Sequence, residues 1–249
     1  MGVGTMEIKN GSRRRAKALI RQALLDPTEN ALAQAEWMAY ILKTDITDIA
    51  QFREKVPASY EAEALHLFYN KQFAESLKVS KLWGRFQQLS SRPLIFSSYL
   101  ASVCLNDDTE ARRILNNALP AQQKDPVILN NYACCLARSG NVPAAIQALR
   151  KAYRCILSER DELILRATQG LISFRTGDVE IEKGRKLYSM AVRGFERTND
   201  FRSAAVATYF WAVEEKRIGS PQASSLVKDA KKRISRFSVF ELEDLVKKL

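Results

Sequence analysis

The stretch DPVILNNYACCLARSGNVPAAIQALRKAYR, residues 125–154, carries the clearest structural pattern in the chain. Asp125 can cap a helix whose first residue is Pro126, which is a favoured arrangement. Apolar and small residues then recur every three or four positions, as on one face of a helix. They are Leu129, Tyr132, Ala133 and Leu136. Gly140 suits the left-handed position after a helix, and a second amphipathic helix follows it, so the stretch predicts a helical hairpin.

Pairs of small residues, seven positions apart, recur beyond this hairpin. The later pairs start at Ala111, Ala145, Gly184 and Ala223, so their spacings are 34, 39 and 39 residues. A period of this size is typical of helical repeat arrays, in which each helix pair buries its apolar face against its neighbours. The recurrence favours a binding scaffold over an enzyme.

Residues 125–154 resemble the tetratricopeptide repeat (TPR). That family's pattern of apolar, small and turn residues is matched here by Tyr132, Ala133, Leu136, Gly140, Ala145, Leu149 and Ala152. Leu129 stands at the family's tryptophan position, and the repeats elsewhere in 58–236 are weaker copies. The resemblance implies an all-α, right-handed solenoid of about five or six stacked antiparallel helix pairs.

The predicted organisation is one repeat domain over residues 12–249. Its units are a degenerate region at 12–57, clearer units at 58–88, 93–122, 125–157, 161–197 and 199–236, and a capping helix at 238–249. Residues 1–11 are expected to be a flexible N-terminus or a cloning remnant. Because a first helix is missing before residue 12, the array begins mid-repeat; either it is degenerate there or the chain is a piece of a longer protein, which we favour.

The bulk composition excludes several classes of protein. The chain has 249 residues, 46% of them hydrophobic, which is enough for a substantial core. It has no apolar run long enough to span a membrane and no apolar region typical of a secretory signal. The four cysteines lie in predicted helices without a CxxC pair, which favours buried free thiols, a reducing compartment and a cytoplasmic location.

No catalytic or cofactor motif is present. The sequence lacks phosphate-binding glycine loops and the GxSxG and HExxH signatures. His66 is the single histidine, so neither a zinc site nor a nucleophile–histidine pair is predicted. We therefore expect no enzyme activity, no cofactor and no metal.

The net charge of +11 is spread evenly along the chain, but two local clusters stand out. One cluster is Arg13-Arg14-Arg15-Lys17, and the other contains Lys228, Lys231, Lys232, Arg233 and Arg236. A basic balance favours acidic partners, whether protein or nucleic acid. A solvated helix face is the simpler explanation of each cluster.

The resemblance also implies a binding groove lined by the first helices of successive units, which in that family commonly takes a peptide or helix. Carried over position by position, the groove residues are Leu65, Phe68, Tyr69, Ser98, Ser102, Asn130, Asn131, Arg138, Leu171, Phe174 and Arg175. This set suits a partly apolar peptide with an acidic element, since arginine pairs well with carboxylates. The alternative is that Phe68 and Phe174 pack within the solenoid.

One subclass of the family holds C-terminal carboxylates with a clamp of Lys, Asn and Arg. Only Asn131 matches that clamp, because Ser98 and Thr168 stand at its charged positions. We therefore expect a protein–protein interaction scaffold without this clamp, and without a membrane partner. Two alternatives stay open: a nucleic-acid-binding repeat protein that uses its basic faces, and a regulatory or assembly module of a larger protein.

Overall fold

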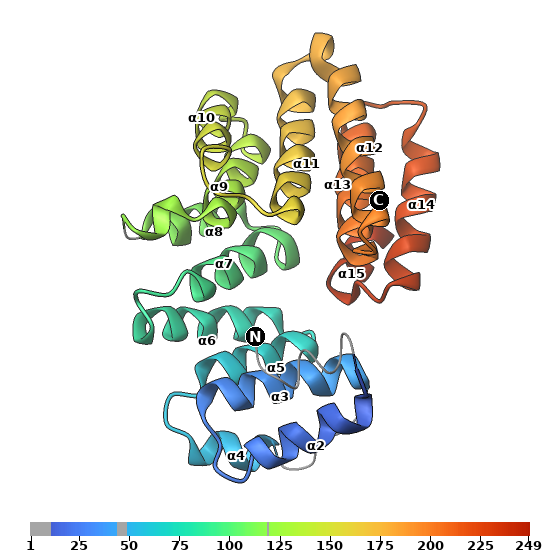
Figure 1. Cartoon of the computed structure of the whole chain (residues 1–249). Coiled ribbons are helices and arrows are strands. Elements are labelled where there is room, and N and C mark those ends of the chain that lie inside the picture. The colour runs from blue at the N-terminus through green and yellow to red at the C-terminus, as the bar shows by residue number, and fades with distance from the viewer. Residues whose placement is uncertain (1–10, 44–48, 119) are drawn as a thin grey trace. The chain divides into compact units, whose positions relative to one another are not determined.

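The computed structural model describes residues 11–43, 49–118 and 120–249, and this part of the chain is all-helical without strands. It contains fourteen α-helices, α2 to α15 (Figure 1). They form two compact units, Met1–Ser97 and Ser98–Leu249. The predicted all-α class is confirmed, whereas a right-handed solenoid and a single domain over 12–249 stay predictions.

The described residues of the first unit contain five complete helices. These are α2 (Arg13–Ala23), α3 (Glu29–Leu42), α4 (Ile49–Lys55), α5 (Tyr60–Tyr69) and α6 (Phe73–Phe86). Ser12 caps α2 and Thr28 caps α3 through their side-chain oxygens. Helix α3 contacts α2, α4 and α5, and α5 packs on α6 (Figure 1). The core gathers on both faces of α3, where Leu32, Ala35 and Met38 are fully buried.

Helix α7 (Arg92–Tyr99) contains the boundary between the units and continues as a π-helical segment, Leu100–Cys104. The second unit goes on with α8 (Asp108–Asn116), α9 (Pro126–Arg138), α10 (Val142–Ala152), α11 (Glu159–Thr176), α12 (Ile181–Arg197), α13 (Phe201–Arg217), α14 (Ala223–Arg236) and α15 (Glu243–Lys247). Its helices pair as α9/α10, α11/α12 and α13/α14, and α9 also packs on α11. Helical hairpins therefore follow one another along the chain in this unit.

The hairpin predicted from residues 125–154 is confirmed in detail. The Asp125 carboxylate accepts the backbone N–H of Val127 at 2.9 Å, and Pro126 begins α9. Gly140 has a φ of 84°, which is the left-handed conformation expected after the helix. The local sequence therefore sets both ends of α9.

Small residues allow α11 and α12 to approach closely. A Cβ atom at Gly184 would lie 2.7 Å from Cδ2 of Phe174 and 3.1 Å from the carbonyl oxygen of Gly170. A Cβ atom at Gly170 would lie 2.9 Å from Cδ2 of Tyr188. Both positions thus need glycine because the facing helix fills the space that a side chain would take.

Three predicted segments differ from the structure or lie partly outside the described residues. A single helix over 238–249 is wrong: Ser238 has a φ of 52°, Phe240–Leu242 is a 3₁₀ turn, and the α-helix begins only at Glu243. This end still packs Val239, Leu242 and Val246 into the apolar core of α13 and α14. A short helix, which the sequence predicts over Asp45–Lys55 before Pro57, is described as α4 from Ile49 to Lys55. Its residues 45–48 and residues 1–10 of the predicted flexible start lie outside the described residues.

Candidate binding surfaces

Arg138, predicted to face the groove, is held by residues of its own unit. Its guanidinium Nε lies 3.0 Å from Oδ2 of Asp108, and Nη2 donates to the side-chain oxygen of Asn106 at 2.5 Å. Nη1 donates to the backbone oxygen of Ser102 at 3.2 Å. The charge also lies over the Phe210 ring, 5.5 Å from its centroid. Arg138 therefore joins α9 to the segments before it.

Arg175 is paired even more completely. Its Nε and Nη2 donate to the two carboxylate oxygens of Glu214, each at 2.7 Å, in a bidentate geometry. The Glu214 side chain is only 2% exposed, and it also accepts from Arg217 Nε at 2.9 Å. Arg175 thus neutralises a buried carboxylate and ties α11 to α13.

The polar groove residues also bond to one another. Asn131 donates to Ser98 Oγ at 3.1 Å, and Thr168 donates to the Asn130 side-chain oxygen at 2.7 Å. These partners lie 33 and 38 residues apart, and Arg175 and Glu214 lie 39 apart. The spacings match the recurrence seen in the sequence, so this polar face links consecutive hairpins.

Most of the apolar groove residues are core residues. Phe68, Leu171 and Phe174 are buried, and so are Ser98, Ser102 and Asn130. Phe68 lies in an aromatic cluster with Phe73 and Phe96, and Phe174 packs against Tyr188. The alternative placement of Phe68 and Phe174 inside the packing is therefore what the structure shows. In the first unit, Leu65 is half-buried and Tyr69 stacks on Tyr40 with ring centroids 4.3 Å apart.

The histidine and cysteine side chains, which could carry chemistry, contact residues that hold the fold together. His66 Nδ1 lies 3.3 Å from Oε2 of Glu36, and Nε2 contacts the Asn70 amide at 3.1 Å. Burial raises the pKa of Glu36, although His66 and Arg53 oppose the rise. Burial likewise raises the pKa of the Cys135 thiol to about 12, so it stays protonated. Within the described residues no cluster of three metal-ligating side chains occurs.

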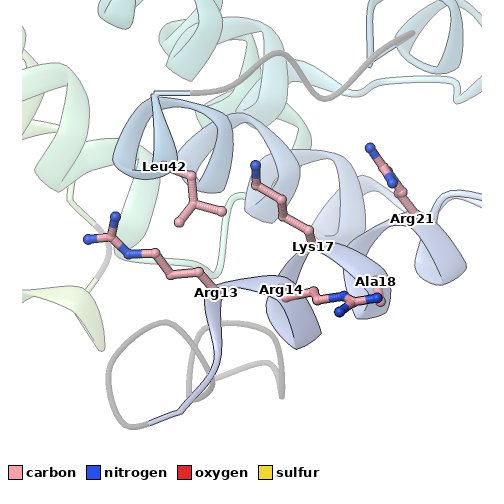
Figure 2. A pocket seen from close by; sticks show the side chains of 6 residues that line it. All are labelled: Arg13, Arg14, Lys17, Ala18, Arg21 and Leu42. Carbon is pink, nitrogen blue, oxygen red and sulfur yellow. The ribbon is translucent and has the colours of Figure 1, made fainter.

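A basic pocket opens instead on the first unit, between α2 and the end of α3 (Figure 2). Its volume is about 470 Å³, and its lining is Arg13, Arg14, Lys17, Ala18, Arg21 and Leu42. Arg13, Arg14 and Arg21 are exposed, and they make no ion pair with any residue that the structure describes. The pocket therefore combines excess positive charge with an apolar contact at Leu42.

The sequence had marked this cluster only as a charge run. Ser12 begins α2 just before Arg13, and the helix buries Ala16 and Ile20 against α3. The opposite side of α2 then presents its cations to solvent, because 3.6 residues complete a turn. Arg21 and Leu42 could not be assigned to the cluster from the sequence, since their proximity depends on how α2 and α3 pack.

Comparisons with protein-family models, with curated proteins and with solved structures give no match to this chain. The resemblance to the tetratricopeptide repeat consequently stays a prediction. In the described part of the chain, no helix combines the length and the apolar character needed to cross a membrane.

Proposed function

We propose that this chain is a non-catalytic helical-repeat scaffold, related to the TPR family, that binds an acidic segment of a protein partner in the α2–α3 pocket. One observation carries the proposal: four cations of α2 line a pocket, and none of the described residues in its lining is acidic. The arginines first expected to bind a partner, Arg138 and Arg175, are already satisfied by Asp108 and Glu214.

The pocket chemistry favours carboxylates on a peptide. Arginine presents a planar fork of donors that suits a carboxylate, and an exposed guanidinium can meet it at little desolvation cost. Leu42 and Ala18 offer apolar contact to a neighbouring side chain. No aromatic ring lines the pocket, so it lacks the stacking surface that single-stranded nucleic acid commonly uses.

The geometry sets a spacing for the acidic groups. Arg14 and Arg21 lie seven residues apart on one helix, which corresponds to about 10 Å at 1.5 Å per residue. A peptide in the polyproline II conformation covers about 9 Å in three residues at 3.1 Å each, and its three-residue turn brings residues i and i+3 to the same side. A Glu-Leu-Gly-Glu segment in this conformation therefore places one carboxylate near each arginine.

The surrounding features fit the same proposal. The four cysteines are all free thiols, which supports a reducing, cytoplasmic setting. His66 supports the buried Glu36 instead of facing a nucleophile, in keeping with a binding protein. We accordingly propose that the helices present the pocket and carry out no reaction.

The test measures binding of a fluorescein-labelled peptide that contains Glu-Leu-Gly-Glu. In the Arg14→Ala/Arg21→Ala variant we expect affinity to fall about tenfold, because two surface charge contacts of up to about 1 kcal/mol each are lost. A control peptide of the same composition with adjacent glutamates should bind several-fold more weakly to the wild type.

The matched control variant is Lys78→Ala/Arg85→Ala, which removes two exposed cations from α6 in the same unit. It should retain the affinity of the wild type. Equal losses in the two double variants would show a general charge effect. That outcome, or indifference to the spacing of the glutamates, would contradict the proposed pocket.

A further inference from the structure

A second basic surface lies on α14 in the other unit. Lys228, Lys231, Lys232 and Arg236 are exposed and follow one another at intervals of three, one and four residues, so they share a helix face. None of the four makes an ion pair with a described residue. We call these four cations the α14 row.

The other exposed positions of α14 carry no opposing charge. They are serines: Ser224, Ser225 and Ser235. The single acid of the helix, Asp229, accepts from Arg233 Nε at 2.8 Å. Arg233 also donates to Glu196 of α12 at 2.6 Å. Arg233, which the sequence grouped with this cluster, thus holds two helices together, and the α14 row stays available.

Aromatic rings adjoin the C-terminal end of the row. The Arg236 guanidinium lies over the Phe237 ring, 5.3 Å from its centroid. Phe237 in turn stacks on Phe201 of α13, with centroids 5.1 Å apart and ring planes 9° apart. Phe201 is 38% exposed. Cations and an accessible aromatic ring therefore meet on one surface of a single unit.

We propose that the α14 row and Phe201 bind single-stranded nucleic acid, with phosphates on the four cations and a base stacked on Phe201. This combination of a positive track and aromatic stacking is how proteins hold single strands without reading their sequence. The row extends about 12 Å along the helix, which corresponds to the rise of three or four nucleotides at 3.4 Å each. The serine hydroxyls beside it can donate further hydrogen bonds to phosphates.

Two other anionic partners fit this surface less well. The apolar side chains of α14 pack inward, with Ile234 buried in the core and Leu226 and Val227 against it, so the helix has no apolar face to insert into a membrane. An acidic peptide would use the cations but would leave the Phe201–Phe237 stack without a function. The proposal is independent of the peptide pocket on α2, since the two surfaces share no residue.

The test is fluorescence anisotropy with labelled single strands of about 16 nucleotides, of RNA and of DNA. Affinity should fall with salt, with a log–log slope of about −0.7 for each phosphate neutralised. Lys228→Gln/Lys231→Gln/Lys232→Gln should weaken binding at least tenfold and make the slope shallower by about 2. Phe201→Leu should weaken binding several-fold and leave the slope unchanged.

The matched control is Arg150→Gln/Lys151→Gln/Arg154→Gln, which removes three exposed cations at the end of α10 in the same unit. This variant should bind like the wild type, and circular dichroism should show native helix content in every variant. Equal losses in the two triple variants would overturn the proposal. It would equally be overturned if the chain bound phosphatidylserine vesicles through the row and bound no single strand, or if Phe201→Leu had no effect.

Discussion

Arg14 on α2 and Arg175 on α11 are both arginines on amphipathic helices, but they lie in opposite surroundings. Arg14 is exposed at the edge of a pocket in which no acid of the described part of the chain takes part. Arg175 is mostly buried and forms two hydrogen bonds of 2.7 Å to Glu214, whose side chain is 2% exposed. One arginine is placed to meet a partner, and the other completes the internal packing of its unit.

This contrast shows that the role of a cation depends on whether a neighbouring helix places an acidic side chain beside it. Glu214 lies 39 residues after Arg175, in the next helical hairpin along the chain, and Asp108 lies 30 residues before Arg138. Helix α2 has no such acid facing Arg13, Arg14 or Arg21 among the residues described. Internal pairing therefore separates the structural arginines from those available for binding.

The largest expected effect follows from breaking the buried pair. Arg175→Ala should lower the free energy of unfolding by about 3 kcal/mol, because it leaves Glu214 as a poorly compensated buried charge. Arg217 still bonds Glu214, which keeps the loss near the lower end for such pairs. Urea denaturation followed by circular dichroism measures the change. The substitution lies outside the α2–α3 pocket and the α14 row.

A second substitution separates the loss of pairing from the loss of packing. Adding Glu214→Gln to Arg175→Ala removes the orphaned charge, so part of the stability should return. If the double variant is as unstable as the sum of the single ones, the two side chains act independently. Arg175 would then contribute mainly through its packing, and the comparison with Arg14 would lose its basis.

The next effect is on how the free energy of unfolding depends on pH. The contributions of one buried glutamate in each unit have opposite signs. Burial on its own would raise the pKa of Glu215, but hydrogen bonds from Arg185, Ser220 and Trp211 hold this pKa below its usual value. In the first unit, burial raises the pKa of Glu61 despite the neighbouring Arg92. The charged form is thus stabilised by folding at Glu215 and disfavoured at Glu61.

Glu215→Gln should cost about 1–2 kcal/mol at pH 7, as for the loss of charged hydrogen bonds. A depressed folded-state pKa contributes stability above the unfolded value of about 4.3, and this contribution is lost as pH falls through the folded pKa. The difference between wild type and Glu215→Gln should therefore shrink on acidification. For Glu61→Gln, acidification should instead change the difference in unfolding free energy in favour of the wild type. Urea titrations between neutral and mildly acidic pH measure how each difference changes with pH.

Local sequence signals predicted the helices well and their partners poorly. Asp125, Pro126 and Gly140 mark the ends of α9 because capping and left-handed glycine depend on neighbouring residues alone. The C-terminal segment was harder: its apolar spacing fits a single helix, but the positive φ of Ser238 interrupts it. Tertiary packing of Val239 and Leu242 onto α13 and α14 selected that break.

The candidate sites show the same limit. The periodicity placed Arg138 and Phe174 on helix faces, but it could not show that Asp108 would pair with one or that Tyr188 would cover the other. The basic run at Arg13 was visible from composition, yet its pocket needed Leu42 from the following helix. Faces of helices follow from local spacing, whereas pairing and burial depend on residues of other helices.

The smallest expected effect on stability comes from the exposed arginines of α2. Arg14→Ala/Arg21→Ala should change the free energy of unfolding by less than about 0.5 kcal/mol, as is usual for exposed positions without partners. The two substitutions remove like-charge neighbours three and four residues from Lys17, which offsets any loss of helix contacts. The variant should therefore unfold with the wild type while it loses the acidic peptide. A loss of stability as large as that of Arg175→Ala would mean that the α2 cations are structural, and the pocket would then need another explanation.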